Sequence, residues 1–85
     1  MVYTVEFSSG AERDFRKLAR EIQLRLRPRI DALADHPRPA GAKKLSGGHE
    51  LWRIRVGDYR IVYELRDRIL VVLVVRVAHR REAYR

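Results

Sequence analysis

Three arginines with strand-like spacing mark the stretch of this chain in which side chains could act together on a charged group. Arg53, Arg55 and Arg60 lie in the segment 51–63, LWRIRVGDYRIVY, and alternate there with apolar residues. The Gly-Asp pair at 57–58 suits a two-residue hairpin loop, because glycine in the first loop position favours a type II′ turn. Such a loop places Arg55 opposite Arg60. Since opposed and alternate residues of paired strands share a face, we expect all three guanidinium groups on one side of the hairpin.

This arginine cluster predicts a site for phosphate. Guanidinium is a planar fork of hydrogen-bond donors that matches phosphate geometry, and in proteins it keeps its charge. Like charges directly opposite each other destabilise paired strands by about 0.2–1 kcal/mol, and a bound anion would remove that cost. An ordinary exposed strand face is the alternative, in which Glu64 offsets part of the repulsion. We favour a role in binding phosphate.

The positive charge of the chain is concentrated toward its C-terminus. Of its 85 residues, 19 are basic and 11 acidic, for a net charge of +8, and 16 of the basic residues are arginine. Residues 53–85 carry nine basic and four acidic side chains (+5), whereas residues 1–36 carry seven and six (+1). Such a surface could simply be solvated, but its uneven distribution favours a polyanionic partner.

The elements that must position the cluster begin with a strand and two helices. Residues Val2–Phe7 alternate as a strand does. A helical pattern follows and ends near Arg20, and a second pattern runs over 22–34. Pro28 lies inside the second pattern, so either the helix bends there or its regular part begins there. Residues 36–49 form a loop rich in proline and glycine.

Three strands with short connections follow the loop, over residues 51–56, 59–65 and 68–77. Strands joined by turns this tight must be antiparallel neighbours. The last strand is apolar on both faces, which indicates an interior position and leaves its free side for the first strand. The order β-α-α-β-β-β in 1–85 therefore predicts one α+β domain, with two helices on one face of a four-stranded antiparallel sheet. The helices should cover the apolar face of the hairpin, formed by Trp52, Ile54, Val56, Tyr59, Ile61 and Tyr63.

Several classes of protein are disfavoured by composition. The chain has no cysteine, which excludes disulfides and thiolate metal sites. Val2–Phe7 is too short for a signal peptide, and the apolar run 69–75 is too short to span a membrane. We therefore expect a soluble, cytoplasmic protein with no membrane partner. His36, His49 and His79 are scattered and no paired carboxylates have ligand spacing, so neither a metal nor another cofactor is expected.

Two segments, taken in order, resemble the RelE/ParE superfamily of toxins from bacterial toxin–antitoxin pairs. They are 43–65, KKLSGGHELWRIRVGDYRIVYEL, and 71–85, VVLVVRVAHRREAYR. The RelE branch is the more similar, and the resemblance covers nearly the whole chain. It implies the fold of the RelE-like microbial ribonucleases and a metal-independent endoribonuclease. Such an enzyme cuts messenger RNA in the ribosomal A site by attack of a 2′-hydroxyl on the adjacent phosphate. It also implies a cognate antitoxin, a toxin–antitoxin hetero-oligomer, and contacts with the ribosome and its messenger and ribosomal RNA.

The resemblance also assigns roles to individual residues. The basic residues of the family's second strand fall on Arg53 and Arg55, and the arginine that begins its third strand falls on Arg60. Its C-terminal arginine falls on Arg80, and the aromatic residue near its end falls on Tyr84. The arginines are expected to neutralise phosphate charge in the transition state. The tyrosine is expected to stack on a base, with packing of the tail as its alternative role.

This chain departs from part of the family at the second strand. Some members have lysine where this chain has Arg53 and Arg55, and lysine can lose its proton to act as a base, whereas arginine effectively cannot. His79 is the best side chain for proton transfer near neutral pH, with a structural role as the alternative. Glu50 is a poorer candidate because, if the strand already begins there, it points to the face that the helices are expected to cover.

Basic residues outside the cluster are expected to hold the backbone of ribosomal RNA through salt-sensitive contacts. These residues are Lys43, Lys44, Arg81, Arg13, Arg16 and Lys17. An acidic, foldable segment of the antitoxin would suit the same basic face. Two other functions stay open: an inhibitor of DNA gyrase without nuclease activity, as in the ParE branch, and a degenerate member that only binds its antitoxin.

Overall fold

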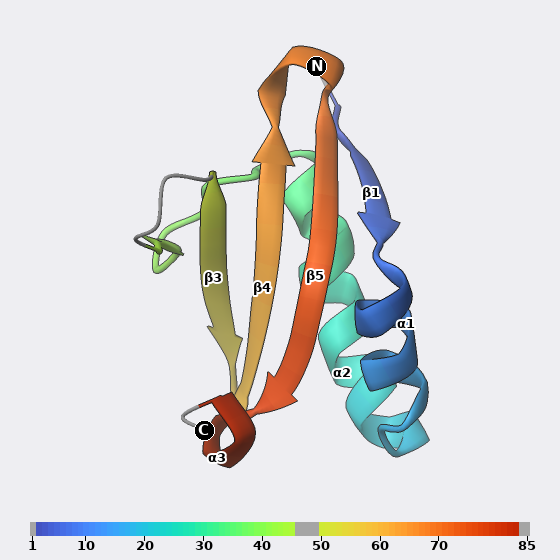
Figure 1. The fold of residues 1–85 in the computed structure, drawn as a ribbon. Coiled ribbons are helices and arrows are strands. Elements are labelled where there is room, and N and C mark those ends of the chain that lie inside the picture. The colour runs from blue at the N-terminus through green and yellow to red at the C-terminus, as the bar shows by residue number, and fades with distance from the viewer. Residues whose placement is uncertain (1, 46–49, 84–85) are drawn as a thin grey trace.

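The computed structural model describes residues 2–45 and 50–83 of the chain and shows helices packed on a single sheet (Figure 1). The strands are β1 (Thr4–Phe7), β2 (Lys43–Lys44), β3 (Leu51–Val56), β4 (Tyr59–Arg66) and β5 (Val71–His79). The helices are α1 (Ser9–Arg16), α2 (Arg20–Asp31) and α3 (Arg80–Ala83), with short 3-10 turns η1 (Ala32–Ala34) and η2 (Asp67–Ile69). None of the helices in this part of the chain is long and apolar enough to cross a membrane.

The sheet is mixed and five-stranded, in the order β1-β5-β4-β3-β2. The α+β class and the β3–β4–β5 meander are confirmed, as is the place of β1 beside β5. The prediction of four antiparallel strands was wrong, because β1 pairs with β5 in parallel and β2 adds a fifth strand. Tight turns fix the direction of consecutive strands only. β1 and β5 are separated by two helices and three strands in the chain, so nothing local prevents them from pairing in parallel. β2 is too short to leave a periodic signal.

Helix α1 is held at both ends by side chains. The Ser8 hydroxyl accepts a hydrogen bond from the amide of Ala11 at 3.1 Å, which caps the first turn. At the other end, the Gln23 amide of α2 donates to the carbonyl oxygen of Phe15 at 2.9 Å. The helix ends at Arg16, earlier than predicted. The Phe15 carbonyl, at the end of the helix, accepts this bond from Gln23 in addition to one from the Leu18 amide just after the helix.

Helix α2 runs through Pro28, so its regular part starts well before that residue. A proline inside a helix costs about 3 kcal/mol, because it removes a hydrogen bond and crowds the preceding turn. Leu26 and Ile30 lie on either side of it and are fully buried. Burying each of these side chains contributes about 1.5–3 kcal/mol, which is enough to offset the proline.

The helices cover the apolar face of the hairpin, as predicted. Leu26, Ile30 and Leu33 meet this face in a single core. The hairpin residues in that core are Ile54, Val56, Ile61 and Tyr63, with Trp52 and Tyr59 packed partly buried at its border. Figure 1 shows α1 and α2 together on one side of the sheet and α3 at the end where β3 stops and β4 starts. Arg53, Arg55 and Arg60 alternate with the core residues of the hairpin, so they lie on the face of the sheet that α1 and α2 leave open.

Strand β5 contains a bulge at the point where its pairing with β4 shifts register. Val62 and Tyr63 are neighbours on β4, but their partners on β5 skip Val75. The irregular stretch is supported from α1, where a carboxylate oxygen of Asp14 accepts a hydrogen bond from the Val77 amide at 3.2 Å. A bulge bends its strand and increases the local twist. The bulge thus affects the direction in which β5 delivers its last residues, and α3 after them, toward the β3–β4 turn.

Candidate functional site

The hairpin register brings the predicted arginines together. Arg55 lies opposite Arg60 in the β3–β4 pairing, and Arg53 is two residues away on the same strand. Gly57 has a φ of +60°, whereas Asp58 is not among the described residues with positive φ, which is the signature of the expected type II′ turn. Arg55 is exposed, while Arg53 and Arg60 are half-buried. Local turn chemistry therefore builds the cluster.

Arg80 joins two of these arginines around a small cavity, which we call the arginine pocket. Arg55, Arg60 and Arg80 line it, together with the turn residues, and its volume is about 50 Å³. The amide of Arg80 donates a hydrogen bond to the carbonyl oxygen of Asp58, so the first residue of α3 is attached to the β3–β4 turn. Three arginines, from β3, β4 and α3, thus line one space together with a single acidic residue, Asp58, and this excess of positive charge is suited to stabilising an anion.

His79 is the last residue of β5 and directly precedes the arginine pocket's Arg80. Its Nδ1 accepts a hydrogen bond from the Arg81 amide at 3.3 Å, and its ring meets Tyr59 edge to face with centroids 5.2 Å apart. Because Nδ1 is the acceptor, the proton of the neutral ring is on Nε2. His79 therefore caps α3 through one nitrogen and carries a hydrogen-bond donor on the other.

The structure separates the two lysines that the sequence grouped together. Lys43 pairs with Arg53 in the β2–β3 register and lines a cavity with Arg53 and Arg55. The ammonium of Lys44 lies 3.0 Å from a carboxylate oxygen of Glu50 instead. Lys43 therefore extends the cluster, whereas Lys44 belongs to a neighbouring network.

Of the other predicted contacts with ribosomal RNA, those on the α1 side lie apart from the cluster, whereas Arg81 follows Arg80 on α3. Arg13, Arg16 and Lys17 are exposed on or just after α1, which packs against β5 on the helix-covered side. Arg16 forms an ion pair with Glu12 one turn earlier. Arg81 is exposed on α3, and the predicted stacking residue Tyr84 lies outside the described residues.

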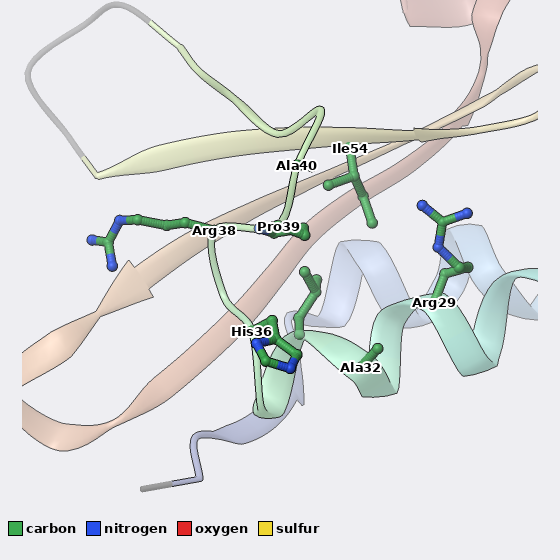
Figure 2. A pocket seen from close by; sticks show the side chains of 8 residues that line it. Arg29, Ala32, His36, Arg38, Pro39, Ala40 and Ile54 are labelled. Carbon is green, nitrogen blue, oxygen red and sulfur yellow. The ribbon is translucent and has the colours of Figure 1, made fainter.

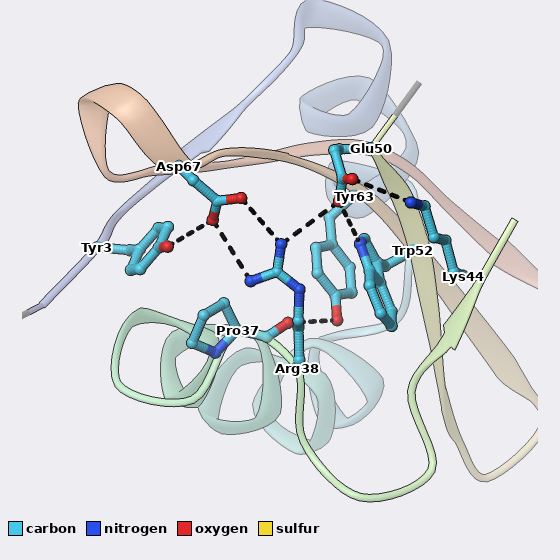
Figure 3. A network of polar contacts seen from close by, with 8 residues as sticks. All are labelled: Tyr3, Pro37, Arg38, Lys44, Glu50, Trp52, Tyr63 and Asp67. Carbon is cyan, nitrogen blue, oxygen red and sulfur yellow. Dashed lines mark hydrogen bonds and ion pairs between the residues drawn. The ribbon is translucent and has the colours of Figure 1, made fainter. Parts of the chain in front are cut away.

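Sequence reasoning missed Arg38, which is the centre of a polar network beside the core (Figure 3). Its Nη2 lies 2.9 Å from Asp67 and 3.4 Å from Glu50, and the guanidinium stacks 5.3 Å from the centroid of the Trp52 ring. The Tyr3 hydroxyl donates to the same carboxylate of Asp67. The network joins the N-terminal segment, the 36–42 loop, β3 and η2, and its only sequence signal was an arginine between two prolines.

The carboxylates of this network are held in their charged form. The hydrogen bond from Arg38, followed by that from Tyr3, lowers the pKa of Asp67. The pKa of Glu50 is lowered mainly by the Lys44 ammonium, then by the Trp52 indole N–H. A carboxylate stabilised in this way is a weak base. This supports the inference from the sequence that Glu50 is a poor candidate for proton transfer.

Replacing Arg38 should destabilise the fold in a way that depends on pH. We expect Arg38→Ala to lower the free energy of unfolding by about 1 kcal/mol near neutral pH, because exposed ion pairs and cation–π contacts are weak singly. The folded pKa of Asp67 is depressed. Its contribution is therefore present above the unfolded value, about 3.9, and is lost as the pH falls through the lower folded value.

Urea unfolding of the Arg38→Ala variant at about pH 7 and about pH 2.5 measures this effect. The difference from the unchanged chain should shrink at the lower pH. Arg68→Ala is the matched control, since Arg68 is an exposed neighbour of Asp67 outside the network. An equal loss in both variants, or a loss that persists in acid, would contradict the prediction.

Tyr63 attaches the same loop to the sheet from the inside. Its side chain is fully buried, and its hydroxyl donates a hydrogen bond to the carbonyl oxygen of Pro37 at 2.7 Å. Burial raises the pKa of Tyr63 to about 12. The backbone of the 36–42 loop is thus held from β4 as well as through Arg38.

Within residues 2–45 and 50–83, no three histidine, aspartate or glutamate side chains gather as metal ligands would.

Known proteins are similar to this chain in sequence and in fold. The family model "ParE toxin of type II toxin-antitoxin system, parDE" matches residues 5–84. The mRNA interferase toxin RelE of Escherichia coli is 30% identical over 82 residues, covering 94% of this chain and 85% of that protein. Toxin RelG of Mycobacterium tuberculosis is 33% identical over 97 residues, covering 100% and 99%. A chain of the toxin-antitoxin complex RelBE2 from Mycobacterium tuberculosis superposes with a TM-score of 0.82 at 30% identity, covering 94% of this chain and 100% of that one. The chain belongs to the RelE/ParE family of toxins of type II toxin–antitoxin systems.

Proposed function

We propose that this toxin is a ribosome-dependent endoribonuclease that cuts messenger RNA in the A site and so inhibits translation in the cytoplasm. The observation that carries the proposal is the arginine pocket, where Arg55, Arg60 and Arg80 surround one small cavity. The similarity of the whole chain to a protein named as an mRNA interferase supports the same activity. No cofactor is part of the proposal.

The proposed reaction is an internal transfer at one phosphate. The 2′-hydroxyl loses its proton and its oxygen bonds to phosphorus, while the bond to the 5′-oxygen breaks and that oxygen takes up a proton. The products are a 2′,3′-cyclic phosphate and a 5′-hydroxyl. Arg55, Arg60 and Arg80 stabilise the extra negative charge of the transition state, often the largest single contribution to such a step.

Proton transfer needs other groups, because arginine keeps its proton. His79 directly precedes Arg80 of the pocket, and the Arg81 amide donates to its Nδ1, which places the proton of the neutral ring on Nε2. In the proposal, His79 first takes up a second proton on Nδ1, which releases the Arg81 amide. The imidazolium then donates its Nε2 proton toward the departing 5′-oxygen and returns to the neutral form, while water takes the proton of the 2′-hydroxyl. Arg53 adds positive charge from the same strand, and Tyr84 stacks on a base.

The proposed partners are a cognate antitoxin and the ribosome. Relatives of this fold were solved as complexes of RelE with RelB, and an acidic antitoxin segment would complement the basic open face. Lys43, Lys44 and Arg81, with Arg13, Arg16 and Lys17 on the α1 side, would contact the ribosomal RNA backbone. Each such contact makes binding weaker as the salt concentration rises.

Induced expression followed by mapping of messenger 5′ ends tests the proposal. New ends should appear inside translated codons, and they should be missing from a reporter message whose start codon has been removed. The family model that matches describes ParE toxins, which makes gyrase inhibition the second candidate. Intact messages together with gyrase-linked DNA breaks would select that second function and reject the nuclease.

A further inference from the structure

Two larger cavities continue from the arginine pocket along the outer edge of β3. The first, which we call the edge cavity, has a volume of about 320 Å³ and shares Arg55 with the arginine pocket. The second, the terminal cavity, has a volume of about 410 Å³ and shares Arg29, Ala40 and Ile54 with the edge cavity. The shared residues fix the order of the three spaces, from the arginine pocket through the edge cavity to the terminal cavity.

The edge cavity and the terminal cavity together form a groove, which exists because the outermost strand, β2, is short. β2 pairs with β3 only at Trp52 and Arg53. From Ile54 to the turn, no strand in the described residues lies beyond β3, and α2 and the 36–42 loop form the walls instead. A guanidinium nitrogen of Arg25 reaches to 3.9 Å from the position of a β-carbon at Gly57.

Helix α2 supplies a row of cations along this edge. Arg25 and Arg29 are four residues apart, so they project from the same side of α2. Arg25 lies at the β3–β4 turn, and Arg29 lines both larger cavities. Figure 2 shows the Arg29 side chain rising from α2 toward Ile54 of β3.

The lining of the edge cavity matches a phosphate backbone. Its charged members are all cations, Arg29, Lys43, Arg53 and Arg55, and its other residues are small or aliphatic. Because three of the four are arginines, they can offer paired donors to phosphate oxygens. The edge cavity also shares Arg55 with the pocket proposed to hold the cleaved phosphate, so one polyanion could reach from one to the other.

The terminal cavity has a different character, which suits a base. Ala32, Leu33, Pro39 and Ile54 give it apolar walls, and the imidazole of His36 lies at its border (Figure 2). Arg38 also borders it, but its guanidinium points away and is engaged by Asp67 and Glu50 (Figure 3). Aromatic and apolar surfaces bind unstacked bases with little sequence preference.

We propose that this groove holds the single-stranded RNA that flanks the cleaved phosphate. Arg29 and Lys43 bind its backbone in the edge cavity, and one base enters the terminal cavity against His36. The inference rests on the proposed nuclease function and adds a binding track for the substrate on α2, away from the pocket where the bond breaks. An acidic peptide is the other occupant that the charge would allow.

Binding of a fluorescent single-stranded RNA of about eight nucleotides, 2′-O-methylated so that it is not cut, tests the track directly by anisotropy. We expect Arg29→Ala to weaken binding about tenfold. The slope of the logarithm of the binding constant against the logarithm of the salt concentration should become shallower by about 0.7, the share of one phosphate contact. Arg20→Ala is the matched control, because Arg20 is an exposed arginine of the same helix that lines none of the three cavities. Its binding should stay within about twofold.

A second measurement addresses the base. One abasic nucleotide should weaken binding to the unchanged protein more than binding to His36→Ala. Equal affinities of Arg29→Ala and Arg20→Ala, or no binding of RNA by the unchanged chain, would overturn the proposal. The proposal would also be overturned if Arg29→Ala weakened the binding of an acidic peptide of glutamates but not the binding of RNA. The RNA track can hold while no message is cut in cells, or fail while messages are cut, so the two proposals are judged separately.

Discussion

The Arg60→Ala variant is expected to cut messenger RNA on the ribosome about 10²–10³-fold more slowly than the unchanged chain, the usual loss when one donor to a developing anion is removed. Arg60 begins β4, lies opposite Arg55 and lines the arginine pocket with Arg80. Its half-buried position means that water would replace the guanidinium poorly. The measurement is single-turnover cleavage of a programmed ribosome complex, followed by gel analysis of the 5′ fragment.

Two further variants make this result specific. Arg66→Ala removes an arginine from the other end of β4, where Arg66 pairs with Glu64 at 2.6 Å, and should cut at nearly the normal rate. Arg60→Lys keeps the charge but not the planar fork, so it should recover only part of the loss. Equal rates for Arg60→Ala and Arg66→Ala would mean that general positive charge, and not the arginine pocket, supports cleavage.

The hairpin could be predicted from sequence because its signals are local. A two-residue loop starting with Gly57 fixes which residues of β3 and β4 oppose each other, and alternation then assigns every side chain to a face. The pairing of Arg55 with Arg60 and the burial of Ile54 and Ile61 follow from those two facts. The face of the hairpin that carries the arginines could therefore be predicted from the sequence alone.

Elements that depend on distant parts of the chain were harder to predict. The parallel pairing of β1 with β5 leaves no mark in either strand's own pattern. The strand just after the bulge at Val75 is bonded by Asp14 of α1, and the end of α1 is bonded by Gln23 of α2. Periodicity within one segment does not report such contacts, since each is decided by packing between segments.

The sequence also left the walls of the site unassigned. Arg29 looked like one of several arginines on a helix, and only the position of α2 beside β3 brings it to the edge cavity. The available signal was the spacing of Arg25 and Arg29, which shifts both by one position from the buried pair Leu26 and Ile30. Charge count alone could not separate them from Arg27, which pairs with an aspartate one turn later.

The helix that bears this row of cations depends on very few buried side chains, which leads to the largest expected effect on stability. Leu26→Ala should lower the free energy of unfolding by about 2–5 kcal/mol, through lost burial and the cavity left behind. Leu26 is 0% exposed in the core between α2 and the sheet. Domains of this size have only about 5–15 kcal/mol of stability in total, so urea unfolding should show a clear fall in midpoint.

Leu24→Ala is the control for that loss, because it makes the same chemical change two residues earlier in the same helix. Leu24 is 63% exposed, so its replacement should change the free energy of unfolding by about 0.5 kcal/mol or less. The pair therefore isolates burial from helix propensity, which is the same for both substitutions. If the two variants unfolded at the same urea concentration, α2 would not be packed on the sheet through Leu26, and the groove beside Arg29 would lose its wall.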